Sequence, residues 1–293
     1  MRKTIFTLSV IGAIGAGALA TAGCGADDVD PAAIAQAAER TRAADSANVR
    51  VGVETEGFGF PGRLRLKGEG VTSLTAPELA LTLDLGPLLA LTGQAGGDGT
   101  ARLRVDGKDV AVDLPELRGF DLPEGADWLR LDLERTIDAM GIDATGLGEI
   151  MTLDPGAQLD VLRTADDVEE VGTETVGGAR TTHYRGTIRI EDFIAELPAA
   201  RRAAARKALD ALEAETDTAD DATAFDVWID AEDRIRRTVQ RAAVPGQQGV
   251  PAGELTITLD LSGFGAARTP AAPPRADTYD VTADVTPALA SQR

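Results

Sequence analysis

Few side chains in this sequence have the chemistry that catalysis or metal binding requires. The 293 residues include one cysteine, Cys24, and one histidine, His183. A single cysteine forms neither an internal disulfide nor a cysteine-based zinc site. A single histidine cannot build a site from several imidazoles, and its place beside Tyr184 in a strand-like run favours a structural role. The sequence also lacks the G-x-S-x-G elbow of serine hydrolases. We therefore expect no enzyme activity, no cofactor and no metal.

Two acidic clusters are the remaining candidates for proton transfer or cation binding. The first contains Asp166, Asp167, Glu169 and Glu170, and the second contains Asp217, Asp220 and Asp221. The first falls where a helical pattern changes to a strand pattern, which favours a charged surface edge over acid–base catalysis. The second lacks the glycine and the terminal glutamate of a calcium-binding loop. We interpret both clusters as solvated surface.

Two further patterns allow a ligand-binding and a structural interpretation. The segment Gly57–Gly62 matches G-x-G-x-x-G, but a dinucleotide site needs a helix after this motif, to hold the phosphates at its amino terminus. Here Pro61 disfavours that helix and residues 63–67 alternate like a strand, so we predict a hairpin turn. The tryptophans, Trp128 and Trp228, could line a ligand site, although packing in the core or at an interface is the favoured interpretation.

The amino-terminal segment has the layout of an export signal. Two basic residues open the chain, an uncharged and mostly apolar run follows from Ile5 to Ala20, and small residues precede Cys24. The run is shorter than the ~20 residues that a helix needs to span a bilayer. We therefore expect a removable signal over residues 1–23. No second long apolar run follows, which predicts no transmembrane helix in the rest of the chain.

The residues around Cys24 resemble the lipobox of bacterial lipoproteins. Ala22 and Gly23 supply small side chains before the cysteine, while Thr21 stands where leucine is usual. In lipoproteins this thiol receives a diacylglyceryl group, and the signal is cut before the cysteine. The resemblance implies a lipid anchor on Cys24 and a tether over residues 24–30. The alternative is a plain signal peptide with an incidental cysteine.

Charge and composition limit the partners of the folded part. The chain carries a formal net charge of −19, and removal of the signal with Arg2 and Lys3 makes the remainder more acidic still. A strongly acidic surface argues against binding of nucleic acid and against attraction to anionic headgroups. Hydrophobic residues make up 43% of the chain and aromatic residues only 4%. The core must therefore be built mainly from Leu, Val, Ile and Ala.

From residue 48 onward, apolar and polar residues alternate in run after run. The runs cover residues 48–54, 63–67, 79–85, 102–105, 110–112, 129–133, 181–190, 225–230, 235–241 and 255–261. Leu and Val occupy most of one face, and charged residues or threonine occupy the other. This period is typical of antiparallel strands with one buried and one wet face. We predict a sheet of about 10–11 strands whose apolar face must be covered.

Helical patterns that could cover this face are interspersed among the runs. They lie at residues 31–44, 135–140, 154 onward and 191–215. Asp30 and Asp154 each precede a proline, which is a signature of a helix start. Several of these segments are rich in alanine and poor in bulky residues, so we expect incomplete coverage. The tail from Gly263 onward is rich in Pro and Ala and is expected to wrap loosely over the sheet.

Two segments resemble the actinobacterial LppX/LprAFG lipoproteins. The segment Leu159–Ile190 is similar to a helix followed by a hairpin in that family, and Leu255–Val281 is similar to its closing strand and tail. The residues that carry the resemblance are Gly178, Thr181, His183, Tyr184, Gly186 and Thr187 in the first segment, and Phe264, Gly265, Ala272, Pro273 and Pro274 in the second. The similarity covers about a third of the chain, and its motifs specify fold better than ligand.

The resemblance implies a LolA/LolB-like half-barrel over residues 31–293. This is an α+β fold with a strongly curved antiparallel sheet and helices covering its concave face. Members of the family bind lipids or glycolipids between sheet and helices, and they are not enzymes. The alternating pattern independently predicts an apolar and incompletely filled space. We expect Leu64, Leu66, Leu81, Leu83, Leu103, Val110, Leu129 and Leu131 to line it, although each could instead belong to a filled core.

The leading hypothesis from the sequence is a lipid carrier anchored on the extracytoplasmic face of the cell membrane. Its expected partners are a lipid or glycolipid, the membrane through the anchor, and an envelope transporter or acceptor protein. The alternative is an envelope sensor or assembly lipoprotein of the same fold that carries no lipid. A hydrolase is the third hypothesis, and it would need a serine or a carboxylate pair in a cleft.

Overall fold

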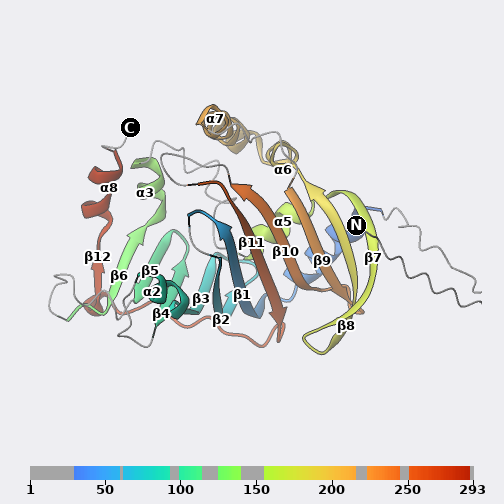
Figure 1. Ribbon diagram of the computed structural model, residues 1–293, viewed down its shortest axis with the longest axis horizontal. Coiled ribbons are helices and arrows are strands. Elements are labelled where there is room, and N and C mark those ends of the chain that lie inside the picture. Colours follow the sequence, from blue (N-terminus) through green and yellow to red (C-terminus); the bar gives the residue numbers. More distant parts are fainter. Residues whose placement is uncertain are drawn as a thin grey trace, which may run out of the picture.

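The computed structural model describes residues 30–59, 62–92, 99–113, 125–139, 155–215, 223–244 and 251–290. Over these ranges, twelve strands form one strongly curved sheet (Figure 1). Their order across the sheet is β12-β6-β5-β4-β3-β2-β1-β11-β10-β9-β8-β7. All neighbours are antiparallel except β12 and β6. The expected α+β fold with a curved, unclosed sheet is confirmed, although the sheet has twelve strands and the sequence predicted about 10–11.

Except for β7 and β12, the strands follow the alternating runs of the sequence closely. They are β1 (Ser46–Gly57), β2 (Arg63–Ser73), β3 (Glu78–Asp84), β4 (Thr100–Asp106), β5 (Asp109–Asp113), β6 (Trp128–Asp132), β7 (Asp166–Val176), β8 (Ala179–Ile188), β9 (Thr223–Asp230), β10 (Ile235–Val244), β11 (Gly253–Ser262) and β12 (Thr278–Asp280). Gly57 and Gly62 have positive φ angles of 91° and 84° and lie between the antiparallel strands β1 and β2. This confirms a hairpin turn in place of a dinucleotide motif.

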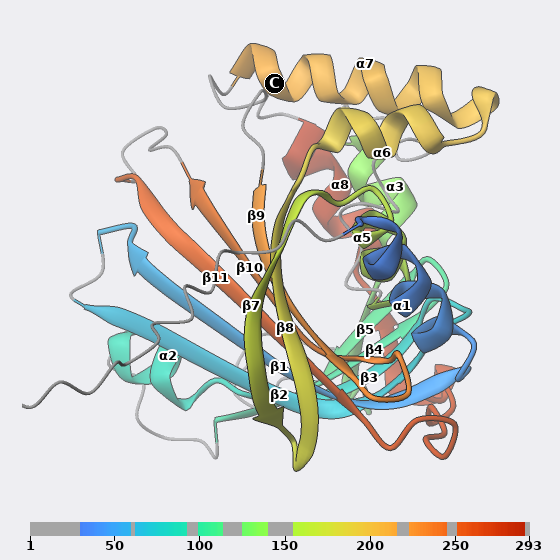
Figure 2. The same ribbon diagram turned by 90° about the vertical axis from the view of Figure 1, so that its right-hand side faces the viewer.

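The helices lie on the inner side of the sheet and around its ends (Figure 2). They are α1 (Ala32–Arg42), α2 (Gly86–Thr92), α3 (Leu133–Ala139), α5 (Pro155–Leu162), α6 (Ile190–Glu196), α7 (Ala199–Glu215) and α8 (Thr282–Ala290), with a 3-10 helix, η2 (Arg275–Asp277). Helices α1 and α5 pack against the concave face. Helices α6 and α7 lie across one end of the strands.

Small side chains and one threonine hold α1 against the sheet. The Asp30 carboxylate accepts a hydrogen bond from the backbone N–H of Ala32 at 3.0 Å, as expected at a helix start. Ile34 is fully buried and is the only bulky apolar residue of this helix. The Thr41 hydroxyl accepts a 2.8 Å hydrogen bond from the backbone N–H of Ile235, which joins α1 to β10. The helix therefore packs closely while covering little area.

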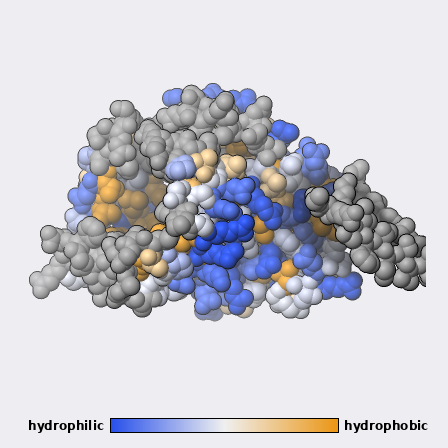
Figure 3. All heavy atoms as spheres, viewed as in Figure 1, coloured by the Kyte–Doolittle hydropathy of each residue, from blue (hydrophilic) through white to orange (hydrophobic). Residues whose placement is uncertain are grey.

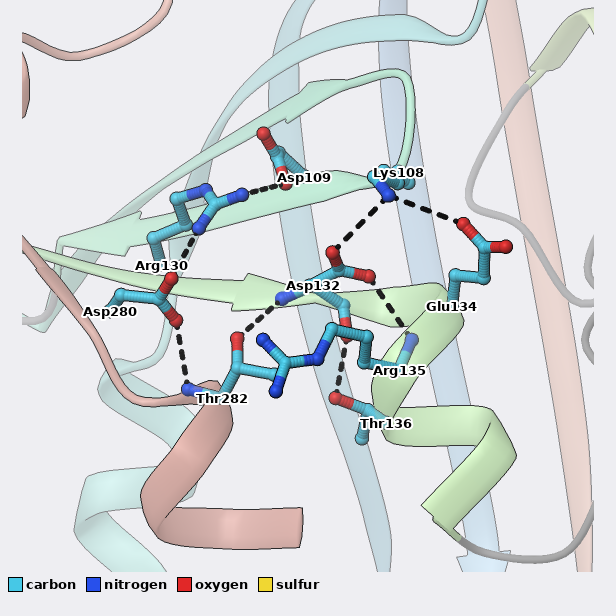
Figure 4. Close-up of polar contacts among 9 residues, drawn as sticks. All are labelled: Lys108, Asp109, Arg130, Asp132, Glu134, Arg135, Thr136, Asp280 and Thr282. Carbon is cyan, nitrogen blue, oxygen red and sulfur yellow. Dashed lines mark hydrogen bonds and ion pairs between the residues drawn. The ribbon is translucent and has the colours of Figure 1, made fainter.

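The carboxy-terminal tail is more ordered than the sequence suggested. Residues 278–280 form β12, which pairs in parallel with β6, and α8 packs beside α3. The buried Thr282 hydroxyl accepts a hydrogen bond from the Asp132 N–H at 2.9 Å, and Arg130 forms an ion pair with Asp280 (Figure 4). The expectation of a loosely wrapping tail was wrong for its end, which the buried Thr282 hydrogen bond and the exposed Arg130–Asp280 ion pair fix.

A glycine in β2 lets two strands approach closely in the middle of the concave face. A Cβ atom at Gly70 would lie 1.8 Å from the carbonyl oxygen of Ala80 in β3, closer than any van der Waals contact. Gly52 in β1 offers a matched control, because a Cβ there would meet only the Thr258 Cβ at 3.7 Å.

We expect Gly70→Ala to lower the free energy of unfolding by about 1–3 kcal/mol, because the strands must separate to admit the methyl group. Gly52→Ala should stay within about 0.5 kcal/mol of the parent protein. Urea unfolding followed by circular dichroism measures both values. Equal stability of the two variants would contradict the close approach at Gly70.

Candidate functional site

The concave face of the sheet carries mostly aliphatic side chains, which form an apolar wall over β3 to β6 and over Leu64 and Leu66 of β2. Strand register places the eight residues expected to line a space on this one face. Leu81 of β3 pairs with Leu103 of β4, and Val110 of β5 pairs with Leu131 of β6. Because side chains alternate along each strand, Leu83, Leu129, Leu64 and Leu66 point to the same side. The eight residues therefore share one face, and their role in lining a ligand space stays a prediction.

The eight residues differ in how well they are covered. Leu81 and Leu103 are buried within the main core, and Leu83 and Val110 are partly buried against it. The other four residues are partly buried and lie outside that core, namely Leu64, Leu66, Leu129 and Leu131. The wall is thus packed in its middle and less completely covered elsewhere.

The anchor candidate, Cys24, and the signal lie outside the described residues.

Coverage also changes along individual strands. In β1, Val49 is buried, whereas Val51 and Val53 further along the strand are only partly buried. In the neighbouring β11, Leu259 is buried, whereas Ile257, which pairs with Val53, is only partly buried. Helix α1 covers the end where β1 begins. The part of the wall near Val53, toward the other end of β1, is therefore less covered. The alternation of apolar and polar residues in the sequence does not predict this difference.

The helices at the end of the strands have an apolar cluster of their own. It contains Phe193, Ile194 and Leu197 of the α6 region with Ala205 and Leu209 of α7. This cluster is separate from the main core, and Val161 of α5 packs against both. Among the described residues, α6 and α7 therefore pack on each other and on α5, while the strands pack under α1 and α5.

The outer face of the sheet is polar and held by ion pairs. Figure 3 shows hydrophilic side chains gathered over the middle of the sheet on this face. Arg237 donates hydrogen bonds to Asp260 on the neighbouring strand at 2.5 and 2.9 Å. Arg102 forms an ion pair with the buried Asp113. The alternation thus separates an aliphatic inner face from a charged outer face.

The single histidine belongs to this outer face and takes part in a structural network. The Nε2 atom of His183 lies 2.7 Å from a carboxylate oxygen of the buried Asp226, and its ring stacks on Trp228 with centroids 4.1 Å apart. Arg185 and Arg241 also bond to Asp226. The Nδ1 atom of His183 lies 3.3 Å from a carboxylate oxygen of Glu174, and Trp228 is buried. A structural role for His183 stays the interpretation from the sequence.

The charge of Asp226 stabilises the fold near neutral pH. Burial raises the pKa of Asp226, but hydrogen bonds from Arg241 and His183 and the charge of Arg185 outweigh it, so the net pKa is lowered. A carboxyl whose pKa is lowered by folding stabilises the protein above its unfolded pKa, about 3.9 for Asp. That contribution is lost as the pH falls through the lower, folded value.

We therefore expect Asp226→Asn to cost about 1–3 kcal/mol at pH 7 and to weaken the loss of stability in acid. Urea unfolding at pH 7 and at a pH below 4 tests this, with Glu254→Gln at an exposed position as the control. An Asp226→Asn protein with unchanged acid dependence would contradict a linkage between this carboxylate and folding.

The remaining chemical candidates do not gather into a reactive site. Asp166 and Asp167 lie where α5 gives way to β7, and Asp167 has a φ of 49°, consistent with a surface turn. The acidic segment 217–221 lies outside the described residues. Within the part of the chain that the structure describes, no three His, Cys, Asp or Glu side chains come together as a metal site. Over the same residues, no helix has the length and hydropathy to cross a membrane.

Comparisons with known proteins give distant matches. No protein-family model matches the chain. An uncharacterized 31.2 kDa protein of Streptomyces griseus is 25% identical over 85% of this chain and 78% of its own length. A protein of Streptomyces coelicolor named as a candidate lipoprotein is 27% identical over 53% of this chain and 43% of its own length.

Solved structures that are similar to this chain include those of three proteins. Lipoprotein LppX of Mycobacterium tuberculosis is 19% identical, with a TM-score of 0.43 and coverage of 83% of this chain and 100% of LppX. LprF of Mycobacterium bovis is 14% identical, with a TM-score of 0.37 over 85% of this chain and 99% of LprF. A LolA superfamily protein of Nitrosomonas europaea is 10% identical, with a TM-score of 0.29 over 83% of this chain and 96% of its own. LppX and LprF carry the names of the lipoprotein group that the sequence resembles. The third protein carries the name LolA, the fold that the resemblance implies.

Proposed function

We propose that this protein is a lipoprotein anchored through Cys24 on the extracytoplasmic face of the cell membrane. In this proposal it binds the acyl chains of a lipid or glycolipid against the concave wall and carries them within the envelope. The proposal involves no catalytic step. It combines the apolar wall, the incomplete cover over it and the lipobox-like residues before Cys24.

The observation that carries the proposal is the partial cover over four leucines of the wall. Leu64, Leu66, Leu129 and Leu131 are aliphatic and partly buried, and they belong to neither packed cluster. A protein that only needed a core would gain stability by packing bulky side chains against such residues. An acyl chain laid along the wall would supply the missing apolar contacts.

The chemistry of the wall suits an alkyl chain better than a polar ligand. Each buried methylene contributes about 0.8 kcal/mol, so affinity rises with the length of chain in contact with the wall. The wall side chains named above carry no charge and no hydrogen-bonding group, so they give little selection among headgroups. Specificity for one lipid must then come from residues at the end of the wall or from a partner protein.

The test is to purify the full chain in mild detergent from a host that exports it, and to extract non-covalent lipid for mass spectrometry. We expect a defined set of lipids at close to one per protein. Extraction leaves the covalent anchor on the protein, so anchor and cargo are separated. A preparation that contains no lipid and exchanges no labelled acyl chain would contradict carriage.

The alternative function, an envelope sensor or assembly protein that carries no lipid, is favoured by one observation. Leu81 and Leu103, two of the residues expected to line a space, are instead buried in the main core. If the whole wall were filled in this way, the fold would act as a rigid scaffold for a protein partner. The lipid analysis separates the two functions directly.

A further inference from the structure

A hollow of about 570 Å³ lies on the outer face of the sheet, opposite the apolar wall. Its floor is the small side chain of Ala111 in β5. Strand pairing places Arg104 of β4 and Arg130 of β6 on either side of this alanine. The ordered tail forms the remaining side and contributes Arg275 from η2. Three guanidinium groups from separate elements thus line one hollow in a strongly acidic protein.

The three arginines differ in whether a carboxylate already forms an ion pair with them. Arg130 is held by Asp109 at 2.5 Å and by Asp280 (Figure 4). Arg104 donates a hydrogen bond to the Leu103 carbonyl oxygen at 2.9 Å and lies over the Trp128 ring. Among the described residues, neither Arg104 nor Arg275 forms an ion pair with a carboxylate. Two positive charges of the hollow are therefore available to a ligand.

The environment of Arg104 makes an anion favourable there. Burial and the neighbouring charge of Arg102 lower the pKa of Arg104, which means that its charged form lacks compensation. One lining residue opposes an anion, because the exposed carboxylate of Asp106 also borders the hollow and has no ion pair among the residues that the structure describes. The other two carboxylates, Asp109 and Asp280, share the single positive charge of Arg130, so one of their two negative charges also opposes an anion.

We propose that this hollow binds a phosphate monoester group between Arg104 and Arg275, above Ala111. Two free guanidinium groups match the charge of a phosphate monoester, which is about −2 near neutral pH. Guanidinium groups donate several parallel hydrogen bonds to phosphate oxygens, and approach from two sides suits a tetrahedral anion. The group could belong to a lipid headgroup or to a soluble phosphate compound. The site is independent of acyl chain binding, because the sheet separates the two faces.

The test is calorimetric titration of the full chain in non-ionic detergent at low ionic strength. Inorganic phosphate is one probe, and dihexanoyl phosphatidic acid below its micelle concentration is the other. We expect saturable binding of both probes. Tighter binding of the lipid identifies a headgroup as the natural source, and equal binding identifies a soluble phosphate. Binding of neither probe would overturn the proposal.

Variants locate the binding. Arg104→Gln and Arg275→Gln should each weaken phosphate binding by roughly tenfold, because each removes charged hydrogen bonds. Ala111→Leu should weaken it by filling the hollow without changing charge, whereas Asp106→Asn should tighten it. One control should leave it unchanged, namely Arg63→Gln, whose side chain is already paired with Glu54 and Glu56. Unaltered affinity in the first three variants would overturn the proposal even if phosphate binds elsewhere.

Discussion

Replacing Cys24 with alanine is expected to move the protein from the membrane fraction to the soluble fraction. The anchor proposed for Cys24 would carry at least two acyl chains, and two chains give stable attachment where one is marginal. Without them, the acidic folded part, in a chain with a net charge of −19, has no attraction to anionic headgroups. Fractionation followed by immunoblotting measures the change, which should be close to complete.

A matched substitution separates loss of the anchor from general damage to the signal. Gly23→Ala keeps a small residue before the cysteine, so this variant should remain on the membrane and incorporate labelled palmitate. The Cys24→Ala variant should incorporate none. Retention of Cys24→Ala in the membrane fraction after a high-salt wash would show that something other than a lipid on this thiol holds the protein.

Changing two leucines of the concave wall to glutamine should remove most of the bound lipid. Leu64 and Leu66 are partly buried outside the main core, so Leu64→Gln/Leu66→Gln replaces apolar contacts with polar groups at modest cost to folding. A loss of about 1.4 kcal/mol corresponds to a tenfold loss in affinity. Two substitutions of this kind should therefore reduce the lipid-to-protein ratio at least tenfold. Mass spectrometry of the extracted lipid gives this ratio.

The same strand supplies the control for the leucine double variant. Arg65 and Lys67 alternate with the two leucines and point to the outer face. The variant Arg65→Gln/Lys67→Gln therefore also introduces two glutamines into β2, but on the face away from the concave wall. This variant should bind lipid normally. If both double variants lost lipid equally, the concave wall would not be the binding surface, and damage to β2 would explain the loss.

Most of the sheet was predictable because its signal is local. Alternation with a period of two marks each strand and also assigns each side chain to a face. Leu81 and Leu103, which pair across β3 and β4, could therefore be placed on one wall from the sequence alone. The two faces follow directly, since the charged positions of the same strands form the outer ion pairs.

The parts that were missed depend on contacts between distant segments. Strand β12 has only three residues in a tail rich in proline and alanine, and it forms because Thr282 and Asp280 bond to β6. The sequence also gives no sign that Gly70 lies against the Ala80 carbonyl oxygen. The differing burial of Leu81 and Leu66 depends on where α1 and α5 lie, which local patterns do not encode.

The hollow over Ala111 was missed for a related reason. Its arginines come from β4, β6 and η2, and each sits in an ordinary alternating or loop pattern. Only the pairing of β12 with β6 brings the tail to this face. The pattern that marks this hollow is an alanine in one strand with an arginine opposite it in each of the two neighbouring strands. This pattern can be recognised only when the pairing register of the strands is known.

The most direct test of the central proposal is to map where an acyl chain touches the protein. A fatty acid with a photoreactive group on its alkyl chain can be bound to the full chain, irradiated and located by peptide mass spectrometry. We predict crosslinks in β2 and β6 at the concave positions near Leu66 and Leu131. Crosslinks confined to the outer face, or none above an unfolded control, would contradict acyl chain binding on this wall.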